Sequence, residues 1–147
     1  MIETYSTWKP IPEIESEMFV DAVIDDCSGL RILLRSRDPL SPVICICFEN
    51  YYVYRNADES YRLLLWSDGV FENKSWPLCK TSQSNLIDWL DNEEGGVYAK
   101  NKMIHYLIKT DVDVIDIVTN QTPPKVWVLN KDEKKDWEGK ISNITFG

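Results

Sequence analysis

The chain has 147 residues, with 16 basic and 24 acidic side chains that give a net charge of −8 at pH 7. This length fits one domain over residues 1–147 with its own core, and 44% hydrophobic and 12% aromatic residues exclude general disorder. The negative charge repels phosphate backbones and anionic lipids, so nucleic acid and membranes are poor partners, whereas a basic protein surface is attracted.

The N-terminal residues and the cysteines bear on where the protein is located. Residues 1–8 lack the basic flank and apolar run of a secretory signal, and no stretch of about 18 apolar residues follows. We therefore expect a cytoplasmic protein. The cysteines contain no C-x-x-C pair, so we interpret them as small buried hydrophobic residues rather than disulfides or zinc ligands: Cys27, Cys45, Cys47 and Cys79.

The first half of the chain alternates between apolar and polar residues. Residues 20–25 and 30–36 each show a period of two, and the Asp-Cys-Ser-Gly turn between them predicts a β-hairpin with oppositely charged outer faces. We expect Leu30, Ile32 and Leu34 to face inward and Arg31 and Arg35 to face outward. Residues 43–48 are apolar on both faces, which predicts a central strand.

The middle of the chain gives weaker signals. Residues 51–54 extend the central strand or form the next one. Asp58 can cap a short helix through Tyr61, Leu64 and Leu65, although residues 63–66 also fit a strand. Residues 67–82 are predicted to be a long irregular connection.

The clearest helix begins after Ser84, a good N-cap, and ends at Gly95-Gly96. Residues 103–109 and 112–118 predict two neighbouring antiparallel strands, and residues 125–129 a further short strand. The charged segment from about residue 130 is expected to be solvated with Trp137 as an anchor, and residues 141–146 to return as an edge strand. The pattern predicts an α+β fold, a mainly antiparallel sheet with one or two short helices packed on it.

No nucleotide-binding or hydrolase motif is present, and we predict neither a cofactor nor a metal. His105 shares a strand face with Met103 and Leu107, which favours a hydrogen-bonded core histidine over a catalytic one. A Cys-His pair around it remains conceivable, without a local motif to support it. Three nearby acids lack the glycine and closing glutamate of a calcium loop, so we expect a turn and the wet edge of a strand: Asp111, Asp113 and Asp116.

One acidic group is unusual. Asp91, Glu93 and Glu94 fall at the C-terminal end of the predicted helix, where negative charge opposes the helix dipole. Such a placement is tolerable on a binding surface for a cationic partner, although acids beside a glycine stop can simply be solvated. The predicted partner contacts are therefore these three acids with Trp89 and Tyr98, and secondarily Asp111, Asp113 and Asp116.

Two stretches carry a family resemblance, Phe48-Glu-Asn-Tyr-Tyr-Val-Tyr-Arg-Asn-Ala-Asp-Glu59 and Ile104-His-Tyr-Leu-Ile-Lys-Thr-Asp-Val-Asp-Val-Ile-Asp-Ile-Val118, the second followed by Pro124. Together they resemble small bacterial immunity proteins of polymorphic toxin systems, of the contact-dependent inhibition or Rhs type. The resemblance covers about half of the chain, residues 48–126. It implies a cytoplasmic protein that neutralises a cognate, basic toxin by tight binding.

The leading hypothesis is thus a stoichiometric protein–protein inhibitor and not an enzyme. The alternative is a small α+β enzyme or ligand-binding domain whose aromatic pocket surrounds His105. A third possibility, a subunit of an obligate assembly, would show itself by a large exposed apolar patch. The sequence leaves homo-oligomerisation open.

Overall fold

A computed structural model describes residues 3–67 and 69–130. In this part of the chain the strands form a five-stranded sheet, in the order β1-β6-β7-β8-β5, and a four-stranded sheet, in the order β2-β3-β4-β9. All pairings between these strands are antiparallel. The elements are β1 (Ser6–Thr7), β2 (Phe19–Asp26), β3 (Gly29–Arg35), β4 (Ile44–Phe48), β5 (Val53–Asp58), the 3₁₀ helices η1 (Glu59–Tyr61) and η2 (Leu63–Trp66), β6 (Leu78–Thr81), α1 (Asn85–Glu93), the 3₁₀ helix η3 (Lys100–Lys102), β7 (Ile104–Lys109), β8 (Asp113–Thr119) and β9 (Lys125–Val128).

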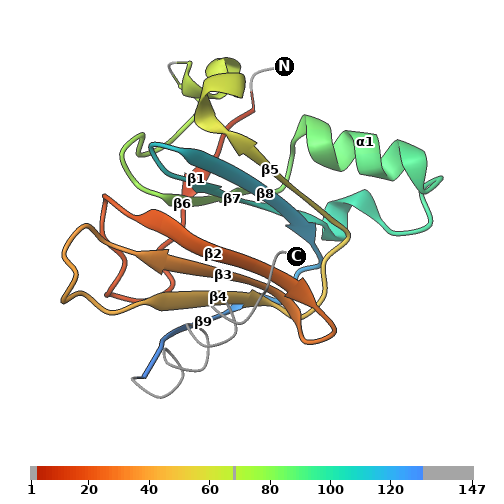
Figure 1. The fold of residues 1–147 in the computed structure, drawn as a ribbon. Coiled ribbons are helices and arrows are strands. Elements are labelled where there is room, and N and C mark those ends of the chain that lie inside the picture. Colours follow the sequence, from red (N-terminus) through yellow and green to blue (C-terminus); the bar gives the residue numbers. More distant parts are fainter. Residues whose placement is uncertain (1–2, 68, 131–147) are drawn as a thin grey trace, which may run out of the picture.

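The two sheets lie face to face, one above the other in Figure 1. The main core fills the space between them with apolar side chains from both: Leu30, Ile32, Leu34, Ile44, Ile46 and Phe48 from the four-stranded sheet, and Leu78, Tyr106, Ile108, Ile115 and Ile117 from the five-stranded sheet. The predicted fold class is confirmed. The sequence does not predict the division of the strands between two sheets, which depends on pairings between distant segments.

The β2–β3 hairpin forms as predicted. Two ion pairs link its charged face, Arg31 to Asp26 at 2.6 Å and Arg35 to Asp21 at 2.9 Å. Arg31 lies on the face opposite the main core, as expected, but it is buried rather than exposed. Gly29 makes the turn at φ 108°, and a Cβ there would lie 2.6 Å from the carbonyl oxygen of Phe48, so the tight approach of β4 also requires glycine.

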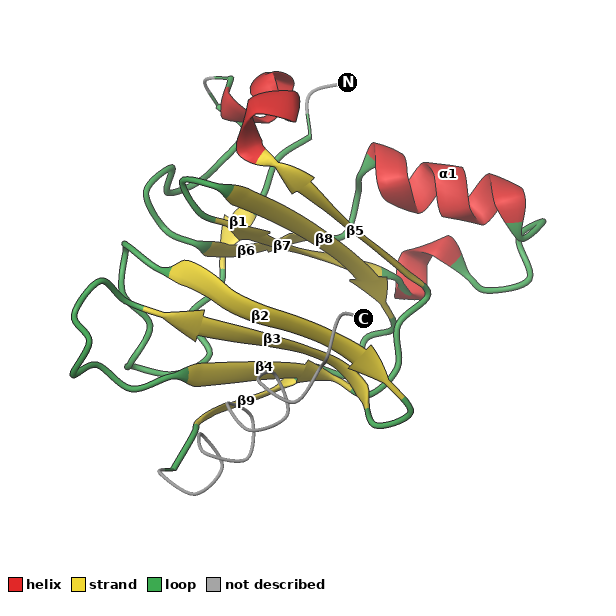
Figure 2. Ribbon diagram, viewed as in Figure 1, coloured by secondary structure: helices red, strands yellow, loops and turns green. Residues whose placement is uncertain are grey.

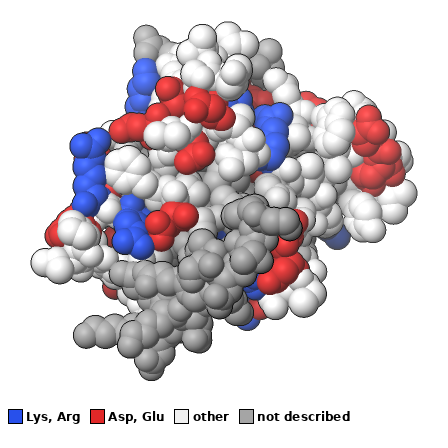
Figure 3. All heavy atoms as spheres, viewed as in Figure 1, with Lys and Arg blue, Asp and Glu red and all other residues white. Residues whose placement is uncertain are grey.

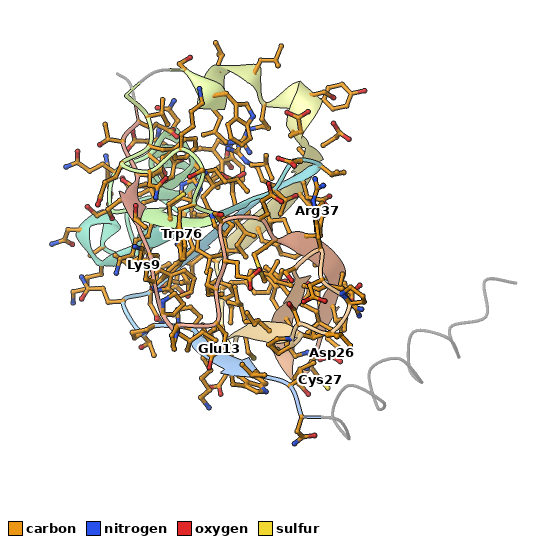
Figure 4. All side chains as sticks on the ribbon, turned by 90° about the vertical axis from the view of Figure 1, so that its left-hand side faces the viewer. Lys9, Glu13, Asp26, Cys27, Arg37 and Trp76 are labelled. Atoms are coloured by element: carbon orange, nitrogen blue, oxygen red, sulfur yellow. The ribbon has the colours of Figure 1, made fainter. Side chains whose placement is uncertain are left out.

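The cysteine prediction holds for three of the four residues. Cys45 and Cys47 are buried on one face of β4, and Cys79 is buried in β6, all as free thiols. Cys27 is the exception, because it stands exposed in the β2–β3 turn, at the edge of the molecule in Figure 4.

Residues 59–67 and 69–82 contain more regular secondary structure than the sequence indicates. Asp58 caps η1, accepting the backbone N–H of Ser60 at 2.9 Å, but two short 3₁₀ helices replace the predicted helix. Within the predicted irregular connection, β6 pairs with β7. Trp76 anchors the connection to the N-terminal segment, since its indole N–H donates to the carbonyl of Trp8 at 2.8 Å and the amine of Lys9 lies 5.0 Å from its ring centroid (Figure 4).

The outer face of the five-stranded sheet is covered in two places. Residues from the N-terminal segment and from the connection between β5 and β6, which contains η1 and η2 (the η1–η2 connection), pack on its centre. They form a cluster of Tyr5, Leu65, Val70, Cys79, Leu107 and Val114. Helix α1 packs beside them through Leu86 and Ile87, against Met103 and Val118 (Figure 2). The predictions for Trp137, for residues 141–146 and for the charged segment beyond residue 130 fall outside the described residues.

Candidate functional site

Helix α1 presents the first group of predicted contacts. The Ser84 hydroxyl accepts the backbone N–H of Ile87 at 3.2 Å, which caps the helix as predicted. With Leu86 and Ile87 buried against the sheet, Trp89 lies on the outer side and remains 50% exposed. The helix ends at Glu93, and Gly95 and Gly96 follow with positive φ.

The loop after α1 brings more aromatic surface to the same end of the helix. The ring of Tyr98 lies 5.5 Å from that of Tyr52, and the Glu94 carboxylate accepts the backbone N–H of Tyr98 at 2.7 Å. Val97 is 78% exposed and Tyr98 56% exposed. We call this group the α1 surface and define it as Tyr52, Trp89, Asp91, Glu93, Glu94, Val97 and Tyr98.

The α1 surface is acidic as well as aromatic. Figure 3 shows acidic atoms gathered at the outer end of α1. In the described part of the chain, none of Asp91, Glu93 and Glu94 forms an ion pair, whereas Asp88 pairs with Lys100 at 2.5 Å. The structure thus brings the five primary predicted residues to one end of one helix.

The second predicted group is not part of this surface. Residues 111–113 follow the C-terminal end of β7, whereas α1 and η3 precede its N-terminal start. Asp111 is exposed, with its carboxylate 3.9 Å from Arg37. Asp113 lies directly opposite Asp58 in the β5–β8 pair, and its pKa is raised by burial and by that neighbouring carboxylate. The two predicted groups therefore lie at opposite ends of β7.

The position of Asp116 differs from the prediction, which placed this residue on the wet edge of a strand. Strand β8 lies between β7 and β5, not at an edge, and the Asp116 side chain is fully buried. It accepts a hydrogen bond from His105 Nε2 at 2.7 Å and one from Arg55 Nε at 2.9 Å, and it also pairs with the Arg62 guanidinium. Asp116 is thus a buried counter-ion and not a direct contact for a partner.

Ser84, His105 and Asp116 form a buried chain of hydrogen bonds. The Ser84 hydroxyl lies 2.7 Å from His105 Nδ1, so a ring with its proton on Nε2 donates to Asp116 and accepts from Ser84. All three residues are at most 1% exposed. The prediction of a hydrogen-bonded core histidine is confirmed.

Asp116 carries the permanent negative charge of this hydrogen-bonded network. Burial alone would raise the pKa of the Asp116 carboxyl, but hydrogen bonds from His105, Arg62 and Arg55 outweigh burial and hold that pKa well below its usual range. The carboxylate is therefore ionised wherever the protein is folded near neutral pH.

The residue types match a Ser-His-Asp triad, but the arrangement differs. In a hydrolase triad Nε2 of the histidine faces the serine and Nδ1 faces the aspartate, whereas here the two nitrogens are exchanged. The Ser84 hydroxyl is also the helix cap, and the buried chain leaves it out of reach of a substrate from solvent. In this arrangement the network positions α1 against β7 and β8. The alternative of a pocket around His105 gains no support, because the ring is 0% exposed.

Sequence reasoning missed the arginines and the serine of this network. One signal was present, because a hairpin with its turn at residues 110–112 places His105 and Asp116 on one face of adjacent strands, with Leu107 opposite Asp116. Arg62 and Ser84 reach the same carboxylate or ring from connections whose path no local pattern specifies.

Metal, membrane and family comparisons add no assignment. Among residues 3–67 and 69–130, no group of three or more His, Cys, Asp or Glu is arranged to hold a metal ion. No helix within these ranges is long and apolar enough to cross a membrane. Comparison of the chain with protein-family models, with curated proteins and with solved structures finds no match.

Proposed function

We propose that this protein is a cytoplasmic immunity protein that binds a basic protein toxin in a stoichiometric complex and blocks it through the α1 surface. The observation that carries the proposal is the exposure of Trp89, Val97 and Tyr98 at one helix end, beside acids without ion-pair partners among the described residues. Exposed aromatic side chains ringed by charge are typical of tight protein interfaces.

The charge distribution supports a cationic partner. Asp91, Glu93 and Glu94 stand at the negative end of the helix dipole, so their charges add to the negative potential of that end, and the nearby Lys100, paired with Asp88, offsets it only in part. A basic toxin surface would gain attraction there, mainly as a faster encounter. Trp89 and Tyr98 would supply the apolar contact that slows dissociation.

The first experiment is co-purification with the product of the neighbouring toxin gene, followed by growth with and without this protein. A one-to-one complex and rescue from toxicity are expected. No complex and no rescue would refute the immunity proposal.

A second experiment locates the surface. Trp89→Ala should weaken the complex by about tenfold or more, as for a central aromatic contact. Glu93→Lys should lower the association rate and its dependence on salt. Glu13→Lys, the same charge change at an exposed site elsewhere, is the matched control. If Asp111→Lys, and not Glu93→Lys, slows association, the partner binds at the other end of β7.

A further inference from the structure

A hollow of about 650 Å³ lies between the η1–η2 connection and the start of α1. Its lining includes two basic residues, Arg55 and Arg62, and the apolar or aromatic residues Tyr61, Leu63, Leu64 and Leu65. The volume falls within the range of small-molecule sites. The hollow is separate from the α1 surface, which lies at the other end of the helix.

The two arginines offer unused donors to this hollow. A guanidinium carries five N–H groups. Arg55 uses only Nε, and Arg62 uses only Nη1 and Nη2, all toward the single carboxylate of Asp116. Within the described residues the Nη groups of Arg55 have no acceptor, and the Arg55 side chain is 48% exposed. The buried Asp116 carboxylate therefore fixes both guanidinium groups, and both arginines line the hollow.

The positive charges of the two arginines near the hollow exceed the negative charge that pairs with them. One carboxylate, Asp116, is shared by two guanidinium groups, and no other ion pair to Arg55 or Arg62 occurs in the described part of the chain. Glu3 also lines the hollow, but its two oxygens accept the Asn85 backbone N–H and the Tyr5 hydroxyl, each at 2.6 Å. The start of α1 therefore partly offsets the charge of Glu3.

The apolar side of the hollow is unusually open. Tyr61 is 84% exposed, Leu63 73% and Leu64 88%. Three large exposed side chains within four residues form an apolar patch of the kind that marks a binding site. A ligand that suits both the arginines and these apolar side chains has one anionic group and an apolar body.

We infer that this hollow binds a small-molecule carboxylate with an apolar chain. The carboxylate accepts hydrogen bonds from Arg55 and Arg62, and the chain lies along Leu63 and Leu64. Paired guanidinium donors suit the planar, two-oxygen geometry of a carboxylate. The inference is independent of the proposed function, since its residues and ligand differ from those of the toxin complex.

The test uses the full chain and decanoate, kept below its aggregation concentration, with calorimetry and the chemical shifts of the arginine side chains as readouts. Saturable one-to-one binding with shifts at Arg55 is expected, and decanol, which lacks the charge, should bind at least tenfold more weakly. Absence of saturation, or equal binding of decanol, would overturn the inference.

Single variants test the arginines and the apolar residues of the hollow independently, and one of them changes a highly exposed side chain so that the fold is preserved. Arg55→Gln should weaken decanoate binding at least tenfold. Leu64→Glu changes a side chain that is 88% exposed, so it should leave the fold intact and abolish binding by repulsion. Glu3→Gln removes the carboxylate that lines the hollow and should tighten binding a few-fold. Unchanged affinity in both Arg55→Gln and Leu64→Glu would place any binding elsewhere and refute the site.

Discussion

Replacement of Asp116 by asparagine should remove a large part of the stability of the fold. Asparagine keeps the volume of the side chain but loses the charge that His105, Arg55 and Arg62 share. Hydrogen bonds to a charged group are each worth about 1.5–3 kcal/mol, and loss of one partner from a buried ion pair costs about 3–5 kcal/mol. Arg55 is 48% exposed and can be rehydrated, whereas His105 is sealed, so we expect a loss of about 3 kcal/mol at pH 7, near the lower bound.

Urea unfolding followed by tryptophan fluorescence measures this loss, because the chain has six tryptophans. A loss of about 3 kcal/mol moves the midpoint by about 1.5 M at a typical dependence on urea. Asp113→Asn is the matched control on the same strand. Its carboxylate has a raised pKa, so its ionised form is unfavourable in the fold and its removal should cost no stability. Equal effects of the two variants, or a loss below about 1 kcal/mol for Asp116→Asn, would refute the role of Asp116.

The same variant has a signature in pH. The folded pKa of Asp116 lies below the unfolded value of about 3.9, so its contribution is complete above that pH and declines as pH falls toward the folded pKa. The difference in free energy of unfolding between wild type and Asp116→Asn should therefore shrink below about pH 4. A difference that stays constant down to acid unfolding would contradict the assignment.

Three further outcomes are expected. Ser84→Ala removes a helix cap and leaves His105 Nδ1 without a partner, so urea unfolding should show a loss of about 2 kcal/mol, and Ser84→Thr should restore most of it. Burial lowers the pKa of Lys109, so the folded state loses this proton at a lower pH than the unfolded state, and the free energy of unfolding of wild type relative to Lys109→Met should rise as pH rises toward the unfolded pKa of about 10.4. With a chromogenic disulfide reagent, Cys27 alone among the four cysteines should react rapidly in the folded protein, and a second fast thiol would contradict the burial of the others.

Much of the fold could be predicted because its patterns are local. The period-two stretches give β2 and β3, the apolar run gives β4, and Ser84 with the glycine stop gives α1. Strand β6 could not be predicted in this way, because its four residues follow Pro77 and pair with β7 in a segment without alternation. The division into two sheets depends on partners far apart in sequence, such as Ile44 with Val128.

The candidate site also contains residues that local sequence patterns predict and residues that they do not. The acids at the end of α1 could be predicted from the Ser84 cap and the glycine stop, and the structure places Glu93 in the last turn, exposed. The exposure of Trp89 could not be predicted from the helical period, because Trp89 is three residues after the buried Leu86 and so lies on a neighbouring part of the helix surface. Asp116 could not, because an acid in a strand is usually an exposed one. Its burial follows from Arg55 across the strand pair and from Arg62 in a connection, and only the tertiary structure brings both to it.

The Asp116 network also bears on how the protein emerges during synthesis. A nascent chain that has reached residue 109 already contains β5, β6 and β7, with Arg55 and His105, but their shared counter-ion is still to be made. Until β8 leaves the ribosome, the five-stranded sheet lacks the strand that joins β7 to β5, and His105 lacks the carboxylate that pairs with it in the folded protein. Most of the stability of that sheet therefore becomes available only late in translation, which favours one cooperative step over a gradual assembly from the N-terminus.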